Sequence, residues 1–226
     1  MQRYAIYYAP EPGPLADFTA QWLGWDAARG LIPPRTTIPG LPRDAEGLTA
    51  DARKYGFHGT LKAPFRLAGD ATEGALSAAC AGMAASLPQV SLRGLILQSL
   101  GGFLALVPTG DTSDLSRLAE QIVLGLEAFR APLTAAETAR RRPDSLTPRQ
   151  RELLASYGYP YVLDQFQFHL TLTGALSDAD LAATKTALAP HLVPLLPHPF
   201  VLRDICLCAE GEDGLFRILH RYALTG

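Results

Sequence analysis

Apolar residues along the chain recur with two different periods. Residues 3–8 combine aromatic side chains with an isoleucine and stop at a group of prolines, which predicts a strand. From residue 14 onward, Leu15, Phe18 and Trp22 follow a helical spacing that ends near Gly30. The same two periods predict strands at 55–67, 90–98, 103–107, 165–173, 201–208 and 215–224, and helices over 76–87, 115–129 and 177–188.

Two segments lack such a simple pattern. Residues 31–54 are rich in proline and charge, so we expect a long loop that is a candidate cover for a site. Residues 130–160 are polar, but Thr134 and Thr147 each have the spacing of a capping box, which predicts a helical insert. Three consecutive arginines, Arg140–Arg142, lie within this insert together with Arg149 and Arg151. This basic stretch could guide a phosphorylated substrate, but we favour a solvated helix face.

The predicted elements repeat in order, and a short motif repeats with them. Residues 57–61 read Phe-His-Gly-Thr-Leu and residues 168–172 read Phe-His-Leu-Thr-Leu, at matching places in the two halves. These features predict one α+β domain over 1–226, duplicated into a lobe of about 1–100 and a lobe of about 101–226. We expect mostly antiparallel strands around a central cleft, with the helices outside.

Composition narrows the range of functions. Hydrophobic residues make up 48% of the chain and charged residues 19%, which excludes a disordered protein. The formal net charge of −2 argues against long nucleic acid as a partner, because such binding needs many contacts between phosphates and basic side chains. Three cysteines without a CxxC pair, no signal peptide and no apolar run of membrane length predict a cytoplasmic protein that does not bind membranes.

The duplicated motif carries the candidate chemistry. Residues two apart on a strand share a face, so His58 should project with Thr60, and His169 with Thr171. Two imidazoles across a cleft suit phosphodiester cleavage, where one takes a proton from the attacking oxygen and the other protonates the leaving oxygen. The threonine hydroxyls can bind the non-bridging phosphoryl oxygens. The near-symmetry leaves open which histidine is the acid and which the base.

Two other interpretations compete for these residues. A pair of structural histidines bonded to nearby carbonyls is the main alternative for His58 and His169. A metal site needs further ligands, and His191 and His198 lie in a proline-rich segment without the spacing of a zinc site, so we expect neither metal nor cofactor.

Weaker candidates for substrate contacts come from the neighbouring positions. Strand alternation assigns Lys62 to the face of His58, with Arg66 further along, and assigns Gln167 and Thr173 to the face of His169. In the first strand, Tyr7 is a candidate for stacking on a base or a sugar.

These motifs resemble the two-histidine (2H) phosphoesterase superfamily, which includes LigT-like RNA phosphodiesterases and cyclic nucleotide phosphodiesterases. The strings RYAIYYAP, YGFHGTLKAPFRL and YPYVLDQFQFHLTLTG are similar to a bacterial branch known as phosphonate metabolism proteins, often encoded beside phosphonate-degradation genes. The resemblance spans nearly the whole chain. It implies that His58 and His169 are catalytic and that Thr60 and Thr171 bind phosphate.

We therefore expect a metal-independent phosphoesterase that hydrolyses a small, cyclic phosphodiester. Its partner would be a small phosphorylated substrate, such as the cyclic phosphate of a nucleotide or a ribose, with a place in phosphonate metabolism suggested by the resemblance alone. Two alternatives stay open: an enzyme that processes RNA ends bearing a 2′,3′-cyclic phosphate, and a non-catalytic binder of a phosphorylated metabolite or nucleotide.

Overall fold

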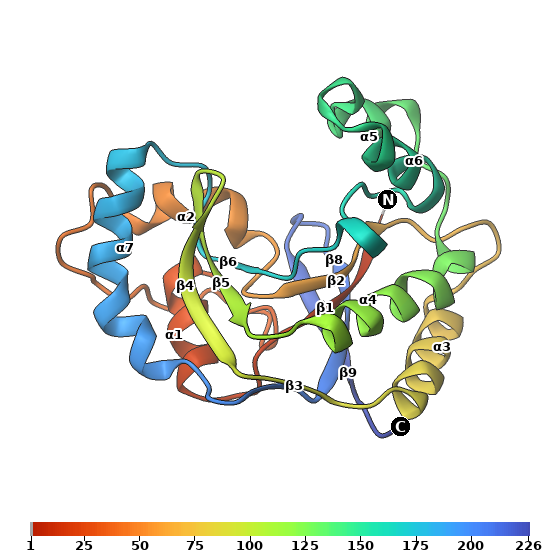
Figure 1. The fold of residues 1–226 in the computed structure, drawn as a ribbon, viewed down its shortest axis with the longest axis horizontal. Coiled ribbons are helices and arrows are strands. Elements are labelled where there is room, and N and C mark those ends of the chain that lie inside the picture. The colour runs from red at the N-terminus through yellow and green to blue at the C-terminus, as the bar shows by residue number, and fades with distance from the viewer. Residues whose placement is uncertain (1) are drawn as a thin grey trace.

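A single curved sheet organises the computed structural model, which describes residues 2–226 (Figure 1). Seven strands pair in the order β4-β5-β6-β2-β1-β8-β9, and every pairing is antiparallel. Strands β3 and β7 form a separate two-stranded sheet. The strands are β1 (Tyr4–Tyr8), β2 (Gly59–Phe65), β3 (Val90–Leu92), β4 (Gly94–Leu100), β5 (Phe103–Thr109), β6 (Leu170–Thr171), β7 (Phe200–Leu202), β8 (Asp204–Glu210) and β9 (Phe216–Ala223).

Helices lie on the outside of this sheet (Figure 1). They are α1 (Pro14–Leu23), α2 (Ala45–Arg53), α3 (Glu73–Ser86), α4 (Ser113–Gly125), α5 (Ala135–Arg140), α6 (Pro148–Tyr157) and α7 (Asp178–Leu192). Helix α3 packs on β8 and β9, α4 packs on β2, and α7 packs on β4 and β5. The mixed α+β class and the antiparallel sheet are confirmed. None of the helices in residues 2–226 is long and apolar enough to cross a membrane.

The structure differs from the sequence-based expectation in two places. The predicted loop over 31–54 contains helix α2, whose start is capped by the side chain of Asp44 accepting from the backbone N–H of Gly47. The predicted strand over 165–173 is reduced to the two residues of β6, preceded by the 3₁₀ turn Leu163–Gln165. The capping boxes at Thr134 and Thr147 both form, and they start α5 and α6 as expected.

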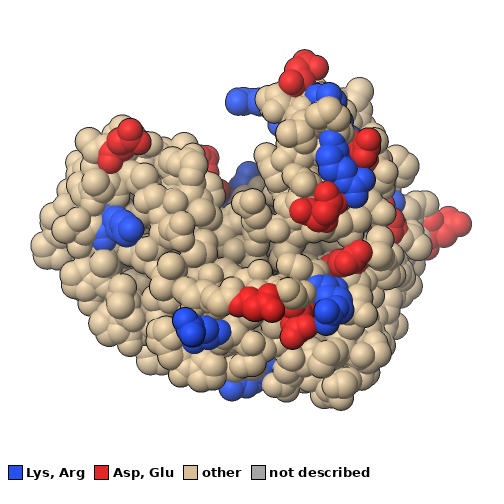
Figure 2. All heavy atoms as spheres, in the orientation of Figure 1, with Lys and Arg blue, Asp and Glu red and all other residues tan. Residues whose placement is uncertain are grey.

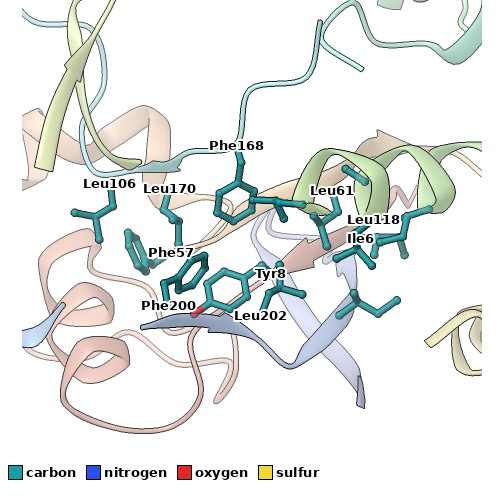
Figure 3. Packing of buried hydrophobic residues seen from close by; sticks show 14 of the residues in the cluster. Ile6, Tyr8, Phe57, Leu61, Leu106, Leu118, Phe168, Leu170, Phe200 and Leu202 are labelled. Carbon is teal, nitrogen blue, oxygen red and sulfur yellow. The ribbon is translucent and has the colours of Figure 1, made fainter. Parts of the chain in front are cut away.

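Buried apolar residues join the sheet to its helices in one main core (Figure 3). Phe57 and Phe168, the first residues of the two motifs, are both 7% exposed and belong to this core together with Leu61, Leu170 and Leu172. The motif residues between them, His58 and His169 among others, are only partly buried. Each motif therefore anchors its polar side chains through apolar neighbours in the chain.

The sheet interleaves the two halves of the chain. Strand β1 lies between β2 and β8, so the first strand of the chain is hydrogen-bonded to a strand that begins 200 residues later. Strand β4, which ends at Leu100, pairs with β5, which begins just beyond that residue. A lobe boundary near residue 100 therefore describes the order of the motifs in the chain, whereas the sheet itself is not divided there.

Candidate active site

The two motifs meet at the centre of the sheet, where β2 and β6 pair. Gly59 is opposite Leu170 in this antiparallel pairing. His58 precedes Gly59 and His169 precedes Leu170 in the chain, so this pairing brings the two histidines to the same part of the sheet.

Both imidazoles are held in the same way. Nδ1 of His58 lies 3.0 Å from the carbonyl oxygen of Gly56, and Nδ1 of His169 lies 2.9 Å from the carbonyl oxygen of Gln167. A carbonyl only accepts, so each contact assigns a proton to Nδ1 and leaves Nε2 free to exchange protons with a ligand. In the resting site, Nε2 of His58 is 3.2 Å from Oγ1 of Thr60.

The apolar residues of the motifs explain why these strands approach so closely. A Cβ atom added at Gly59 would lie 2.3 Å from Cζ of Phe168. Phe168 points into the core and packs near Tyr8 and Phe200, with ring centroids 6.1 Å from each (Figure 3). The glycine of the first motif therefore makes room for the phenylalanine of the second.

A cavity of about 230 Å³ opens beside the paired motifs, and we call it the His–Thr cavity. His58, Thr60, His169 and Thr171 all line it. In the space-filling view the surface is hollowed between the part of the molecule that carries α2 and α7 and the part that carries α5 and α6 (Figure 2). The four residues expected at the site are therefore brought together in one pocket.

The environments of the two histidines differ. The ring of Tyr7 stacks on His58 with centroids 3.9 Å apart, and Tyr55 packs from another side at 5.7 Å. Burial lowers the pKa of His58 to about 4, and the nearby His169 adds a smaller effect in the same direction. His169 has Phe103 as its aromatic neighbour, at 5.6 Å. At neutral pH, His58 is therefore uncharged and able to accept a proton.

Of the weaker candidates, some line the His–Thr cavity and others do not. Tyr7 and Thr173 line the His–Thr cavity. Lys62 does not, because its ammonium group is buried, lies 2.8 Å from a carboxylate oxygen of Glu127 and donates to the carbonyl of Val123. The cause is irregular pairing of β1 with β2, where Tyr7 is opposite Thr60 but Ile6 is opposite Lys62. This bulge breaks the alternation from which the position of Lys62 was predicted.

Two further candidates also lie away from the cavity. Gln167 is exposed, and its contribution is the carbonyl that holds His169. Arg66 makes two hydrogen bonds of 2.9 Å to the carboxylate of Glu137, at the start of α5. It therefore holds the insert in place and does not line the His–Thr cavity.

Several residues that line the cavity were not predicted from the sequence. Asp51 and Tyr55 come from α2 and the turn after it, within and beside the segment expected to be a loop. Arg3 reaches the cavity from the start of β1. Arg141, at the C-cap of α5, and Tyr159, which follows α6, come from the polar insert and also line the cavity. The sequence did contain a signal for α2: an aspartate suited to cap the helix, followed by Leu48 and Ala52 at helical spacing.

The remaining histidines do not form a metal site. Residues 2–226 contain no group of three or more His, Cys, Asp or Glu side chains placed to hold a metal ion. His191 stacks against Phe18 at 6.5 Å, and Nδ1 of His198 lies 3.3 Å from the carbonyl of Arg93, so these two histidines have separate surroundings.

Comparison with solved structures gives similarity over the whole chain at low sequence identity. LigT of E. coli complexed with 3′-AMP is 18% identical, with 100% of this chain and 99% of that chain covered and a TM-score of 0.47. TT0787 of Thermus thermophilus is 18% identical, with 99% and 98% covered and a TM-score of 0.44.

Comparison with curated sequences gives closer relatives. A protein of Janthinobacterium sp. (strain Marseille) named "Ribose 1,5-bisphosphate phosphokinase PhnN" is 41% identical over 220 residues, covering 95% of this chain and 49% of that protein. A protein of the same name from Laribacter hongkongensis (strain HLHK9) is 33% identical over 213 residues, with 94% and 49% covered. The chain thus spans about half the length of these relatives. The model of the family described as "Protein of unknown function (DUF1045)" matches residues 60–217, more than half of the chain. The chain therefore belongs to the DUF1045 family.

Proposed function

We propose that the protein is a metal-independent phosphoesterase that hydrolyses a small cyclic phosphodiester. One observation carries this proposal: two histidines, each with Nδ1 bound to a backbone carbonyl, line one cavity together with two threonines. A pair of purely structural histidines would not need a cavity between them. A site that transfers protons on both sides of a phosphorus atom needs this arrangement.

The different surroundings of the histidines support an assignment of roles. His58, whose pKa is lowered to about 4, is neutral at pH 7 and takes a proton from water as the water oxygen bonds to phosphorus. His169, in its protonated form, gives a proton to the ester oxygen as the bond from phosphorus to that oxygen breaks. Thr60 and Thr171 donate hydrogen bonds to the non-bridging oxygens, where negative charge is held during the transfer.

Proton balance completes the cycle. One turnover adds one water, opens one ester bond, and leaves His58 protonated and His169 neutral. Exchange of protons with solvent returns both to their starting states. The general acid and the general base are each expected to contribute about 10²–10⁴-fold to the rate.

The size of the cavity favours a small substrate. Its volume of about 230 Å³ lies below the roughly 300–1,000 Å³ of pockets for drug-sized ligands. A net charge of −2 adds no general attraction for a polyanion. A cyclic phosphate fits because it is compact, and because the attacking water and the leaving ring oxygen lie on opposite sides of its phosphorus atom, each within reach of one histidine.

The named relatives support a substrate from phosphorylated ribose chemistry. Their name describes a kinase for ribose 1,5-bisphosphate, and this chain corresponds to about half of each of them. None of the three lysines, Lys54, Lys62 and Lys185, follows a glycine, so the sequence lacks the Gly-Lys pair of a P-loop. We therefore assign to this chain a phosphoesterase step on a related sugar phosphate and not the kinase step.

The test is phosphorus NMR of the chelator-treated protein with 2′,3′-cyclic nucleotides, ribose 1,2-cyclic phosphate and a linear diester. His58→Ala and His169→Ala should each lower turnover by at least about 100-fold while the melting temperature stays close to wild type. His191→Ala, at an exposed histidine, is the matched control and should retain full activity.

Two results would contradict the proposal. A loss below about tenfold in both histidine variants would remove the acid–base mechanism. Thermal stabilisation by a cyclic phosphate without any product would instead establish a binding protein. Turnover confined to RNA ends with a 2′,3′-cyclic phosphate would keep the chemistry and replace the substrate.

A further inference from the structure

The His–Thr cavity contains polar groups that the proposed proton transfers do not use. Two guanidinium groups, of Arg3 and Arg141, line it, and so do the phenol rings of Tyr7, Tyr55 and Tyr159. They come from β1 and the residue before it, the turn after α2, the C-cap of α5 and the segment after α6. All five side chains thus line one small cavity, although their segments are far apart in the chain.

Arg141 is the only one of the three consecutive arginines that lines the cavity. It is half-buried, while its neighbours Arg140 and Arg142 are exposed. Its guanidinium lies over the ring of Tyr159, 5.0 Å from the centroid, which fixes its position without neutralising its charge. Among the ion pairs of residues 2–226, none involves Arg141.

Arg3 plays a different part. Its Nε donates to Oε2 of Glu210 at 2.7 Å, and Nη2 donates to the other carboxylate oxygen. These two bonds use one edge of the guanidinium fork and leave the donors on Nη1 without a partner in the described chain. Because Glu210 balances its charge, Arg3 supplies a positioned hydrogen-bond donor, and Arg141 supplies the net positive charge.

The three tyrosine hydroxyls complete the set of donors. None of the hydroxyl groups of Tyr7, Tyr55 and Tyr159 has a hydrogen-bond partner among residues 2–226. Tyr7 is only 1% exposed as a residue and lines the cavity, so its hydroxyl is a candidate donor to a ligand there. Burial raises the pKa of Tyr7 and of Tyr159, which keeps both hydroxyls protonated as donors.

From these contacts we propose that the cavity binds a second, terminal phosphate group of the substrate, held by Arg141 with hydrogen bonds from Arg3 and the tyrosines. This inference rests on the proposed function for the first phosphate, the diester between the histidines. A terminal phosphate has three oxygens and up to two negative charges, which match several converging donors and one unneutralised guanidinium. A cavity of about 230 Å³ favours a small scaffold, such as a sugar, between the two groups.

The experiment compares two substrates that differ in one group: a ribose cyclic phosphate with and without a phosphate on its free hydroxymethyl arm. Arg141→Ala should lower kcat/KM by at least about tenfold for the phosphorylated substrate and by less than about twofold for the other. Arg142→Ala removes the same charge from the neighbouring exposed position and should change neither value. Arg141→Lys, which keeps the charge but not the fork, should recover part of the loss.

Equal losses for both substrates in Arg141→Ala, or equal effects of Arg141→Ala and Arg142→Ala, would overturn the second site. If the wild type turns over neither substrate, the proposed function fails for ribose cyclic phosphates, and calorimetry then tests the second site alone. Ribose 1,5-bisphosphate should bind the wild type at least about tenfold more tightly than ribose 1-phosphate, which lacks the terminal phosphate, and this preference should vanish in Arg141→Ala. Equal binding of the two compounds by the wild type would refute it.

Discussion

At the scale of single residues, the contact between Gly59 and Phe168 ties one motif to the other. The glycine has an ordinary strand conformation, so its role is to leave space, since any side chain would collide with the aromatic ring. The phenylalanine in turn fills the core beneath the paired strands (Figure 3). The histidines and threonines on either side of these two are therefore placed by packing.

Replacing this glycine should disturb the site and the fold together. Gly59→Ala puts a methyl group where the ring of Phe168 lies, and overpacking of this kind costs about 1–3 kcal/mol of unfolding free energy. Urea unfolding measures the effect. Gly82→Ala is the matched control, because its position on α3 is exposed and has nothing within 4 Å, so it should stabilise by about 0.5–1 kcal/mol.

The lowered pKa of His58 predicts a specific pH dependence of stability. The folded pKa is about 4 and the ordinary value is 6.5, so below pH 6.5 the unfolded chain takes up a proton more readily than the folded one. Stability is thus lost as the pH falls from 6.5 toward 4. Urea unfolding at pH 7 and pH 4.5 should show a smaller loss for His58→Gln than for wild type, whereas His191→Gln should follow wild type. Parallel behaviour of all three proteins would contradict this assignment.

The same shift bears on catalysis. A base with a pKa near 4 keeps its accepting form throughout the neutral range, so kcat/KM should stay level on the acid side until the pH approaches 4 to 5. A profile that instead falls around pH 6.5 would show that His58 titrates as an ordinary histidine in the free enzyme. Steady-state rates across this range provide the measurement.

At the residue scale, the sequence predicted correctly which side chains share a cavity wherever strand alternation is undisturbed. His58 and Thr60 share a cavity, as do His169 and Thr171, because both motifs flank regular pairing at Gly59 and Leu170. The prediction for Lys62 was wrong because a bulge cannot be seen in the alternation pattern itself. Arg3, Tyr55 and Tyr159 were beyond reach, since only the fold brings them to the cavity from distant segments.

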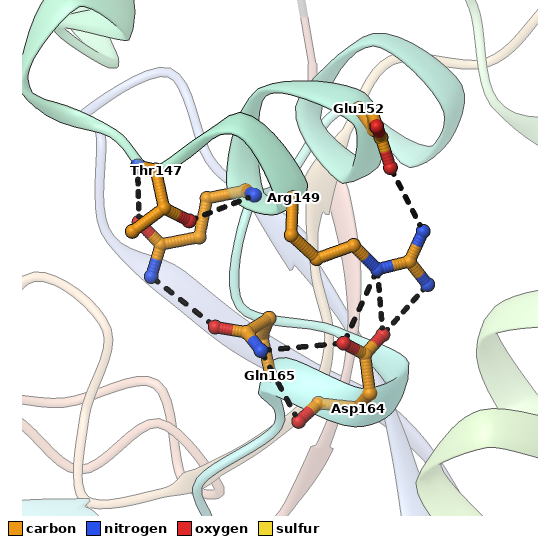
Figure 4. A network of polar contacts seen from close by, with 6 residues as sticks. Thr147, Arg149, Glu152, Asp164 and Gln165 are labelled. Carbon is orange, nitrogen blue, oxygen red and sulfur yellow. Dashed lines mark hydrogen bonds and ion pairs between the residues drawn. The ribbon is translucent and has the colours of Figure 1, made fainter.

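At the scale of elements, the polar insert is fastened to the molecule by charged and polar contacts. Arg149 at the start of α6 binds Asp164 through Nε and Nη2, at 3.0 and 2.7 Å, and also Glu152 (Figure 4). Arg66 of the body binds Glu137, which closes the capping box of α5. These contacts place Arg141, the residue that caps α5, at the cavity.

Loss of Glu137 should therefore loosen α5. Glu137→Ala removes both the capping bond to Thr134 and the ion pair to Arg66, and the loss of such a cap costs about 1 kcal/mol. Hydrogen exchange over residues 135–141 should accelerate about fivefold, and KM for a phosphorylated substrate should rise with little change in kcat. Glu152→Ala, at an exposed ion pair, is the control and should leave exchange in α5 unchanged. Unaltered exchange in the first variant would show that α5 is held by other contacts.

Elements with a strong apolar period were the ones that the sequence predicted well. Helix α4 and the β4–β5 hairpin appear near their expected positions, because burial imposes a regular pattern on them. Helix α2 was missed because it is short and largely polar, and charged residues hide its one buried face around Leu48. Strand β6 shrank to two residues because the turn at Leu163–Gln165 and the contacts of the insert displace the chain before it.

At the scale of the whole molecule, the candidate site lies where strands β4, β5 and β6 join strands β2, β1, β8 and β9. Strand β6 pairs with β2 only at Gly59 and Leu170. A phosphate bound by both threonines would therefore connect the two groups of strands. Inorganic phosphate at about 100 times its Kd should add about 2.7 kcal/mol of stability. For a chain of this size, that corresponds to a rise in Tm of about 5–10 °C.

Thermal unfolding with phosphate, and with sodium chloride at the same ionic strength, measures this effect. The rise should disappear in the double variant Thr60→Ala, Thr171→Ala and persist in Thr186→Ala, at an exposed threonine of α7. An equal rise in sodium chloride would assign it to general salt effects.

The interleaved sheet has a consequence for how the chain is synthesised. Strand β1 carries Tyr7, which stacks on His58, yet one of its two neighbours is β8, which begins at Asp204. A nascent chain that has emerged only as far as β5 holds the first motif without the second and exposes an unpaired edge along β1. The cavity that both motifs line can therefore form only after β8 has left the ribosome, and a fragment with one motif alone lacks two of the four His and Thr residues that line it.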